Sequence, residues 1–546
     1  MTDSNPLFAP KLFTVLKEGY GFAHLRQDAL AGTTVAIVAL PLSMAIAIAC
    51  GASPERGLTA AIVGGLLISL LGGSRHQIGG PAGAFIVLVA AALLRHGPEG
   101  LALATMLSGL ILAGMGLMRL GTFVKYVPFP VTLGFTAAIG IIIAVSQLPD
   151  LFGMAASASA HGSVSERLVA VAGHLDAVTP AALFIAALTI ATIIGMKRIA
   201  PRLPGFLFAI VVATVAATFL PGAETVGERF GRLPSFLPAP RLPPMLPEAI
   251  LAVLPDALAF ALLGAIESLL SAVVADGMTG RRHRANTELI AQGIANIGSA
   301  LFGGLPVTGT IARTATNVRA GAHGPVSGII HALVLLIFMA IAAPLAGLIP
   351  LAALAGLLLV VAWNMIEIDA IKALVRASRA ETVVFLVTLG LTLFRDLTEA
   401  IVVGVALSSF VVINRLAALA DVKSHDRSEP DALDTQDRDI VVYKVSGAFF
   451  FASTATVSRV LDRIGDPREA LVLDLSAVQI LDATGAHAIA EAAHKAARRS
   501  MTFAIAGAAP APARMLKALI PGVTLYTGVD EARAAIQSEK DGASDP

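Results

Sequence analysis

Cysteine, tryptophan and charged residues are scarce in this chain of 546 residues. There is one cysteine, Cys50, and one tryptophan, and only 14% of the residues are Asp, Glu, Lys or Arg. A single cysteine excludes an internal disulfide and a cysteine-rich metal site. The low charge content excludes an ordinary soluble globular protein, and the net charge of +1 predicts no nucleic-acid partner.

Motifs of enzymatic chemistry are missing as well. The sequence has no nucleotide-binding loop and no arrangement of nucleophile, base and acid, and its histidines lack the spacing of metal ligands. The first 25 residues also lack the apolar core and cleavage site of a signal peptide. We therefore expect neither an enzyme nor an ATP-driven pump, and no bound cofactor.

Hydrophobic residues make up 56% of the chain and its mean hydropathy is +0.79, values typical of a polytopic α-helical membrane protein. Apolar stretches predict seven membrane segments in residues 28–220 and seven in residues 249–419, joined by a proline-rich connector at 221–248. The first seven are expected near 28–50, 57–73, 81–94, 99–118, 123–147, 180–196 and 204–220. The second seven are expected near 249–275, 286–303, 310–320, 325–348, 350–365, 381–395 and 397–419.

The third segment of each half is short and follows a glycine- and proline-rich break. The first break runs from Gln77 to Phe85 and contains Pro81, and the second runs from Gly303 to Thr310. The apolar stretch after each break is shorter than the roughly 20 residues that cross a bilayer. Because seven is odd, two such halves in series lie upside down relative to each other, as an inverted repeat. Half-helices of this kind direct positive N-terminal ends at an anion in secondary transporters, so the sequence predicts a carrier with an anion site.

Two charged residues lie inside apolar segments of the second half. Arg313 follows the second break directly, where it either supplies positive potential to a substrate anion or forms a permanent pair with an acid. Glu267 is the obvious acid, since at helical rise it lies about 16 Å past Asp256, near mid-membrane. Glu267, Ser271 one turn on and carbonyls near Gly309 form an expected oxygen cage for a small hard cation such as Na⁺. Protonation of Glu267 and pairing with Arg313 are the alternatives.

A proline interrupts the first membrane segment. Pro41 is expected to kink the helix and expose backbone polar groups, with Leu42, Ser43 and Ile46 lining the same cavity. Packing alone also explains such a kink. Lys and Arg are more frequent in loops on the side of the N-terminus, which predicts a cytoplasmic segment 1–27 and both termini in the cytoplasm.

Composition changes after the last membrane segment. Residues 420–438 are polar and predicted to be a linker, residues 439–538 a small α/β domain, and residues 539–546 a disordered tail. Strands are expected at 440–445, 470–475 and 502–506, and helices at 484–499, 511–519 and 529–537.

These residues together resemble the SulP family of anion transporters, known in animals as solute carrier family 26. The motifs of the resemblance are Asp28, Ala31-Gly32, Leu40-Pro41, Gly73-Ser74-Arg75, Gly80-Pro81, Ile266-Glu267-Ser268, Ala285-Asn286, Glu288-Leu289, Gly303-Gly304, Pro306-Val307-Thr308-Gly309 and Arg313. Asp474-Leu475-Ser476 and Asp482-Ala483-Thr484-Gly485 resemble the family's sulfate transporter and anti-sigma antagonist (STAS) domain.

The resemblance implies a core domain that moves against a gate domain in an elevator-like way, in a homodimer embedded in the lipids of a bacterial inner membrane. It implies an anion held between segments three and ten and closed in by side chains of segment one. The residues implied are Leu42, Ile46, Pro81, Ala82, Gly83, Thr310, Ile311, Ala312 and Arg313. Many relatives carry Gln or Glu where this chain has Leu42, and Ser where it has Ala312, so a coupling role for a first-segment carboxylate is not expected.

The eighth segment is most similar to bacterial members that include the sodium-dependent bicarbonate transporters of cyanobacteria, which place sodium ligands at the positions of Glu267 and Ser271. This favours symport of bicarbonate or another small inorganic anion, coupled to Na⁺ or H⁺ through Glu267. Sulfate, a proton-coupled dicarboxylate carrier, and an anion sensor that signals through the STAS domain to a cytosolic partner remain open. Thr484 matches the position phosphorylated in soluble anti-sigma antagonists, although a helix cap at Asp482 or Thr484 also explains the motif.

Overall fold

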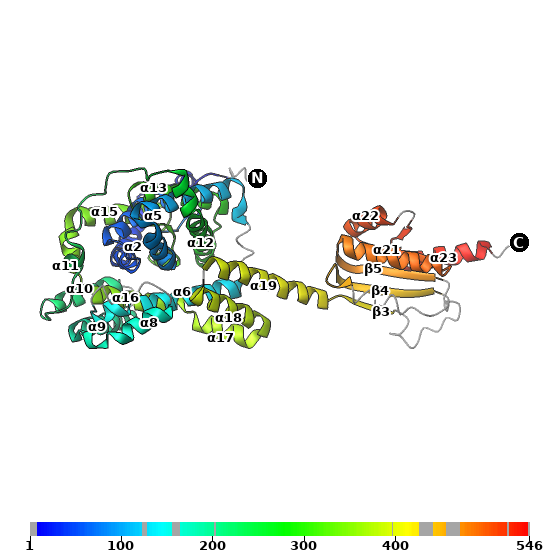
Figure 1. The fold of residues 1–546 in the computed structure, drawn as a ribbon. Coiled ribbons are helices and arrows are strands. Elements are labelled where there is room, and N and C mark those ends of the chain that lie inside the picture. Colours follow the sequence, from blue (N-terminus) through cyan, green and yellow to red (C-terminus); the bar gives the residue numbers. More distant parts are fainter. Residues whose placement is uncertain are drawn as a thin grey trace. The chain divides into compact units, whose positions relative to one another are not determined.

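The chain forms two compact units in the computed structural model, Met1–Val405 and Ala406–Pro546 (Figure 1). The structure describes residues 8–122, 128–154, 164–200, 204–395, 397–424, 440–454, 470–520 and 523–543. Within these residues, nine helical stretches are long and apolar enough to cross a membrane.

Helices occupy the seven segments expected in the first half. They are α2 (Phe22–Ala49), α3 to α4 (Pro54–Thr59, a π turn at Ala60–Gly64, and Gly65–Leu71), α5 (Ile86–Leu117), α6 (Phe129–Ser146), α9 (Pro180–Ile199) and α10 (Gly205–Ala217). The third and fourth segments are both parts of α5, which is broken at Gly97. Gly97 has φ 66°, a left-handed conformation that favours glycine, and Pro98 follows it. Two short helices, α7 (Leu148–Phe152) and α8 (Val164–Gly173), were not expected.

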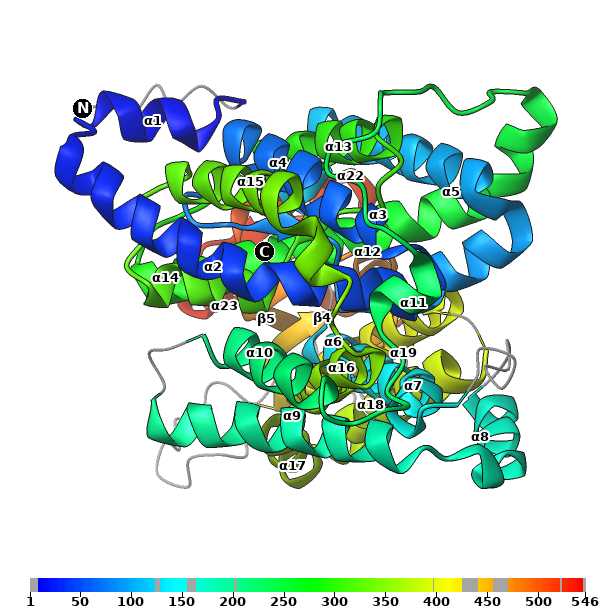
Figure 2. The ribbon, with the colours of Figure 1, turned by 90° about the vertical axis from the view of Figure 1, so that its left-hand side faces the viewer.

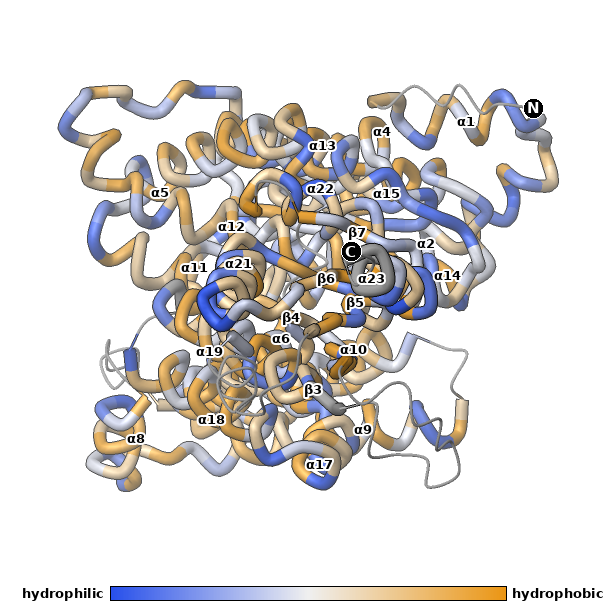
Figure 3. The backbone as a smooth tube through the Cα atoms, turned by 90° about the vertical axis from the view of Figure 1, so that its right-hand side faces the viewer, coloured by the Kyte–Doolittle hydropathy of each residue, from blue (hydrophilic) through white to orange (hydrophobic). Residues whose placement is uncertain are grey.

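The second half repeats this series. Its helices are α12 (Pro247–Thr279), α13 (Ala285–Leu301), α14 (Ile311–Arg319), α15 (Val326–Ala346), α16 (Leu351–Met365), α18 (Arg379–Phe394) and α19 (Leu397–Ala418), with a short α17 (Ile368–Ala377) before α18. The tube coloured by hydropathy shows these helices mostly apolar, with polar residues gathered at their ends and in loops (Figure 3). Helix α14 is an exception, because the half-helix IARTATNVR is largely polar.

The membrane helices divide into two groups (Figure 2). In the core domain, α5 packs on α12 and α13, and α15 packs on α2 and α4. In the gate domain, α6 packs on α16 and α18, and α9 packs on α10 and α16. Each repeat therefore gives its first four segments to the core domain and its last three to the gate domain, as the inverted repeat requires.

A close helix crossing in the core domain depends on two glycines. A Cβ on Gly109 of α5 would lie 2.5 Å from the carbonyl oxygen of Gly293 on α13, and a Cβ on Gly293 would lie 2.5 Å from that of Gly109. Small residues let membrane helices approach backbone to backbone. The crossing fixes α13 directly against the helix that carries the third segment.

Two opposite faces of the membrane unit are called the α1 face and the α11 face, after the helices that lie at them. On the α1 face, helix α1 (Lys11–Lys17) is bound to the end of α4, where the Lys11 amide donates to the Gly72 carbonyl at 2.9 Å. On the α11 face, helix α11 (Val226–Phe230) is bound to the turn between α15 and α16, where the Val226 amide donates to the Ile349 carbonyl at 2.9 Å.

The C-terminal unit is a five-stranded sheet in the order β3-β4-β5-β6-β7. The strands are β3 (Asp421–Ser424), β4 (Ile440–Phe449), β5 (Ala470–Leu481), β6 (Thr502–Ala506) and β7 (Leu525–Tyr526), and all neighbours are parallel except β3 and β4. Helices α21 (Ala483–Arg498) and α22 (Pro510–Leu519) cover one face, and α23 (Val529–Ala543) covers the other. This is the α/β domain that the sequence predicts.

Three details of this unit differ from expectation. Strand β3 lies at the start of the segment 420–438 that was predicted as a linker, where it adds an antiparallel edge to β4. Strand β7 is only two residues long, too short to leave a pattern in the sequence. Helix α23 continues to Ala543, beyond the predicted start of the tail at residue 539. Residues 425–438 of the predicted linker, residue 439 at the start of the predicted domain and residues 544–546 of the predicted tail lie outside the described residues.

Candidate functional site

The two breaks are hydrogen-bonded to each other in the middle of the core domain. Strand β1 (Gly79–Gly80) pairs antiparallel with β2 (Thr308–Gly309), and the Thr310 amide donates to the Ile78 carbonyl at 3.1 Å. A 3-10 turn (Gly83–Phe85) then leads into α5, and Ile311 begins α14. The structure thus brings the N-terminal ends of the two half-helices together, as the sequence predicts.

Glycine is required at the centre of this pairing. Gly80 has φ 157°, and a Cβ there would lie 2.1 Å from Nη1 of Arg313. A side chain at this position would force the guanidinium of Arg313 to move, in a backbone conformation that favours glycine.

Arg313 joins three elements of the core domain. Its Nη2 donates to the Pro81 carbonyl at 3.1 Å and to Ser43 Oγ of α2 at 3.2 Å, and only 1% of the residue is exposed. Its Nε and Nη1 have no hydrogen-bond partner among the described residues. No carboxylate of the described residues forms an ion pair with Arg313, so the alternative of a permanent pair with Glu267 is not supported. The guanidinium keeps its positive charge beside the two half-helix ends.

The start of α14 also lacks a side-chain cap. Thr310 occupies the N-cap position, but its hydroxyl faces the Ile78 carbonyl at 3.4 Å and accepts no bond from the first turn. Uncapped N–H groups at a helix N-terminus are suited to bind an anion. Ile311 is 41% exposed and Ala312 is also exposed, so this end of α14 reaches open space.

The remaining residues of the expected anion site are packed more tightly. Leu42, Ile46 and Ala82 are at most 7% exposed, and Pro81 is buried. Gly83 is half-buried, and a Cβ there would lie 3.3 Å from Cδ1 of Ile143 on α6. The first break therefore faces the gate domain at Gly83.

Helix α12 is bound to the second break and to the half-helix that follows it, on the face that carries Glu267. Thr308 Oγ1 donates to the Gly264 carbonyl at 3.1 Å, and Ser271 Oγ donates to Thr314 Oγ1 at 3.1 Å. Glu267 lies between Gly264 and Ser271 on this face of the helix. Its carboxylate has no hydrogen bond or ion pair within the described part of the chain. The Ser271 hydroxyl donates its proton to Thr314, so its oxygen is left as an acceptor.

No group of three or more His, Cys, Asp or Glu side chains among the described residues could hold a metal ion. A cation bound near Glu267 would therefore depend on hydroxyl and carbonyl oxygens, the donor set of weakly held hard cations. The expectation of a Na⁺ site at Glu267, Ser271 and Gly309 stays a prediction.

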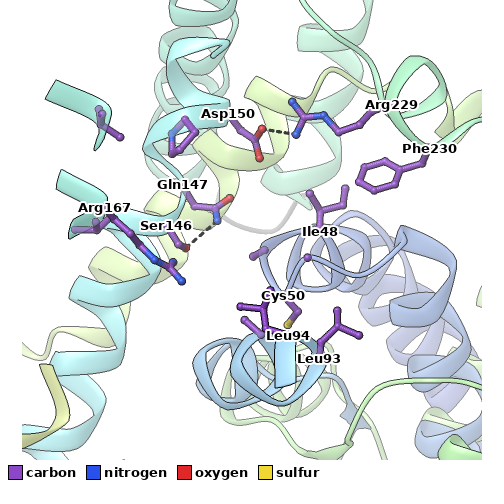
Figure 4. A pocket seen from close by; sticks show the side chains of 16 residues that line it. Ile48, Cys50, Leu93, Leu94, Ser146, Gln147, Asp150, Arg167, Arg229 and Phe230 are labelled. Atoms are coloured by element: carbon purple, nitrogen blue, oxygen red, sulfur yellow. Dashed lines mark hydrogen bonds and ion pairs between the residues drawn. The ribbon is translucent and has the colours of Figure 1, made fainter. Parts of the chain in front are cut away.

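A cavity of about 480 Å³ separates the two domains near the α11 face (Figure 4). Its core-domain wall is apolar, with Ile48, Cys50, Leu93 and Leu94. Its opposite wall is polar, formed by α6, α7, α8 and α11, with Ser146, Gln147, Asp150, Arg167 and Arg229. Arg229 donates to Asp150 at 2.6 Å and to Glu224 at 2.5 Å, so acids already neutralise its charge. We therefore do not place the substrate anion here.

Several functional candidates were missed at the sequence level. Gln77, Gln292 and Asn296 are buried and bind the backbone or side chains that shape the breaks. The available signal was the spacing of Glu288, Gln292 and Asn296, which puts three polar side chains on one face of an otherwise apolar helix.

In the C-terminal unit, Asp482 is the N-cap of α21. Its Oδ1 accepts from the Gly485 amide at 2.8 Å and its Oδ2 from the Phe451 amide at 3.1 Å. Thr484 is exposed in the first turn of the helix. The cap role thus belongs to Asp482, and the hydroxyl of Thr484 is accessible to a modifying enzyme.

Comparisons with known proteins agree in both units. Residues 25–388 match the model of the sulfate permease family, and residues 432–532 match that of the STAS domain. YvdB of Bacillus subtilis (strain 168), whose name proposes a sulfate transporter, is 34% identical over 91% of this chain and 94% of its own length. The bicarbonate transporter BicA of Synechocystis sp. (strain ATCC 27184 / PCC 6803 / Kazusa) is 33% identical over 94% of each chain.

Two solved structures are also similar. The transmembrane domain of a cyanobacterial BicA has a TM-score of 0.62 and 30% identity, and the match covers 71% of this chain and 98% of that one. The murine solute carrier 26 family member A9, an anion transporter in its inward-facing state, has a TM-score of 0.85 over 97% of this chain and 94% of its own. At 19% identity, this second likeness is one of fold alone.

Proposed function

Since the chain belongs to the sulfate permease family of anion transporters, we propose that it carries a small inorganic anion of the bicarbonate or sulfate class by secondary active transport. The observation that carries this proposal is Arg313, a buried cation without an acidic partner in the described residues, beside two half-helix ends. In low dielectric such a group attracts a negative solute strongly.

The proposed binding site lies where the breaks meet. The uncapped N–H groups of Ile311, Ala312 and Arg313 and the start of the third segment at Pro81, Ala82 and Gly83 surround the anion. Leu42 and Ile46 of the first segment are proposed to close the site, and Thr310 fixes the second break to the first. Arg313 supplies the charge.

Alternating access is proposed to arise from elevator-like movement of the core domain past the gate domain. The place where a Cβ on Gly83 would meet Ile143 lies on the proposed sliding surface, and the cavity beside Cys50 lies on the same boundary near the α11 face. Inward movement of the breaks would bring the anion to the α1 face, which we propose is cytoplasmic in a bacterial inner membrane, with both termini on that side.

Coupling is proposed to run through Glu267. A carboxylate without a partner inside the membrane is costly, so it favours a bound Na⁺ or H⁺. Binding that cation beside the breaks would offset the repulsion of two negative groups, which links anion affinity to cation binding. The homodimer and a regulatory cytosolic partner of the STAS domain, acting at Thr484, are further proposals.

Uptake into proteoliposomes tests this function. Labelled bicarbonate or sulfate should accumulate only with an imposed Na⁺ or pH gradient, and Glu267→Gln should remove the gradient dependence. A competition series of bicarbonate, sulfate, chloride and succinate identifies the substrate. Competition by succinate without any effect of sodium would favour a proton-coupled dicarboxylate carrier. Tight binding without flux would favour a sensor.

A further inference from the structure

Helix α13 carries a row of buried polar side chains that do not belong to the proposed anion site. Glu288, Gln292 and Asn296 are spaced four residues apart on one face and are at most 2% exposed. Burying a polar group within the membrane costs free energy, so a row of three indicates a structural or functional role. We call these three residues the α13 ladder.

Asn296 holds the second break. Its Nδ2 donates to the Val307 carbonyl at 2.8 Å, and its Oδ1 accepts from the Val307 amide at 2.9 Å. The side-chain amide therefore satisfies both backbone groups of the residue that precedes β2. Ser299, one turn nearer the end of α13, donates to the Leu305 carbonyl at 2.6 Å.

Glu288 holds the first break. Its Oε2 accepts from the amides of Gly73 and Ser74 at 2.8 and 3.0 Å, and its Oε1 accepts from Gln77 Nε2 at 2.8 Å. Gln292 Nε2 donates to the same oxygen at 2.8 Å, so the middle residue of the row is bonded to Glu288. Bonds to a carboxylate are stronger than neutral ones.

The two ends of the ladder meet at the breaks themselves. Gln77, held by Glu288, lies against the second break, because a Cβ on Gly309 would lie 1.9 Å from Gln77 Nε2. Asn296 lies eight residues from Glu288, about 12 Å along the same helix. One rigid helix thus binds the chain leading into each break, at two fixed points.

From these contacts we infer that the α13 ladder is a positioning device that sets the two half-helix ends relative to each other without touching the anion. This inference rests on the proposed function, since it concerns the site at which that function would occur. Small displacements of preorganised donors cost binding steeply, so loosening the ladder should weaken anion affinity in particular.

The test compares Asn296→Asp, Asn296→Leu and Glu288→Gln with the parent protein in proteoliposomes. Asn296→Asp is nearly isosteric but replaces the donor to the Val307 carbonyl by a second acceptor, and it serves where the leucine variant fails to fold. Each variant should raise the KM for the anion at least about tenfold while maximal uptake per folded protein stays within about threefold. Anion-induced increases in melting temperature should shrink in parallel.

Thr105→Val is the matched control. Thr105 is a fully buried polar residue of α5 in the same domain, but among the described residues its hydroxyl bonds only the Leu101 carbonyl of its own helix. This variant should leave KM unchanged. An unchanged KM in the ladder variants, or an uptake that falls only in proportion to the folded protein, overturns the inference. Failure of the parent protein itself to bind or move any anion would instead overturn the proposed function.

Discussion

Arg313 is the residue on which the proposed chemistry depends most directly. Its guanidinium is charged at every physiological pH, and one nitrogen, Nη2, makes both of its hydrogen bonds, to the Pro81 carbonyl and to Ser43. These neutral acceptors orient the group without cancelling its charge. The side chain therefore serves as a fixed positive pole at the breaks.

Replacing Arg313 by Ala should lower the affinity for the anion at least about 100-fold, because the fixed charge is lost. Arg313→Lys should recover only part of it, since an ammonium keeps the charge but cannot reproduce the planar fork. Isothermal titration or anion-dependent melting of the purified protein measures both effects. Full binding by the alanine variant would leave Arg313 a structural role only.

His76 gives the protein a predictable sensitivity to acid. It lies in the loop before β1, and burial, aided by the charge of Arg75, lowers the pKa of its imidazole to about 4. The ordinary pKa of histidine is 6.5. Between pH 4 and pH 6.5, His76 is therefore protonated in the unfolded chain but neutral in the folded protein. The stability contributed by neutral His76 is therefore complete above pH 6.5 and falls as the pH drops toward 4.

His76→Asn should reduce the loss of thermal stability between pH 7 and pH 5. For the parent protein this titration costs up to about 1.4 kcal/mol for each pH unit below 6.5. The exposed His174, replaced in the same way, is the control and should leave the pH profile of the melting temperature unchanged. Identical profiles for His76→Asn and the parent protein would contradict the argument.

For single residues, the charged groups of the site could be predicted from the sequence, but their hydrogen-bond partners could not. Arg313 and Glu267 could be found because an ionised residue in an apolar run is conspicuous. The hydrogen bonds of Arg313 could not, because the Pro81 carbonyl belongs to the backbone and is placed by the pairing of distant segments. Asn296 and Gln77 were overlooked because single amides in helices and loops usually have no such role.

Among the elements, the pairing of β1 with β2 decides the geometry of the site. Each strand has only two residues, and both lie in glycine-containing breaks of different repeats. Gly80 lets the first break cross over Arg313, with no room for a side chain. The elements most important for function are thus the least regular ones.

Gly80→Ala should displace the first break, since its methyl group would meet Arg313 Nη1 at 2.1 Å in a backbone conformation that alanine rarely adopts. We expect a lower melting temperature and at least a tenfold loss of anion affinity, as an order-of-magnitude estimate. Gly114→Ala in α5 is the control, because nothing lies within 4 Å of its Cβ and alanine favours a helix by up to about 1 kcal/mol. Equal affinities in the two variants would refute the steric argument.

Elements with long apolar runs were predictable and short ones were not. The helices that fill the expected membrane segments begin and end within about six residues of the predicted bounds, because a bilayer demands a minimum apolar length. Strands β3 and β7 and helix α8 were missed, since two to ten residues give little periodicity. The two-residue pairing of the breaks required knowledge of which segments are neighbours in space.

For the membrane unit as a whole, the odd number of segments per repeat was enough to predict the inverted topology. The division into core and gate domains came from the family resemblance and not from hydropathy. Apolar runs give no information on which helix packs on which. That information lies in close contacts such as the one between Gly109 and Gly293.

The single cysteine offers a probe of movement between these domains. Cys50 is 2% exposed and lines the cavity at the boundary near the α11 face. If the core domain moves past the gate domain, its accessibility must change during the cycle. We expect its labelling by a membrane-impermeant maleimide to change at least about threefold when saturating anion shifts the conformational populations.

The control for this measurement is Phe236→Cys in a Cys50→Ala background. Phe236 is 77% exposed in the connector, so its labelling should not depend on the anion. Labelling of Cys50 that stays constant while uptake proceeds would argue against relative movement at this boundary. Labelling of inverted vesicles only by maleimide added outside them, which reaches the cytoplasmic side, would reverse the proposed orientation.

The hydrogen-bonded pairing of β1 with β2 also has a consequence for the direction of the proposed transport. Because one strand comes from each repeat, we expect the two halves of the proposed anion site to move together and to make the same contacts with the anion on either side of the membrane. A carrier of this kind would have no preferred direction of transport, because it would release the anion as readily as it binds it. The gradient of the proposed coupling ion, Na⁺ or H⁺, would then determine whether the anion enters or leaves the cell.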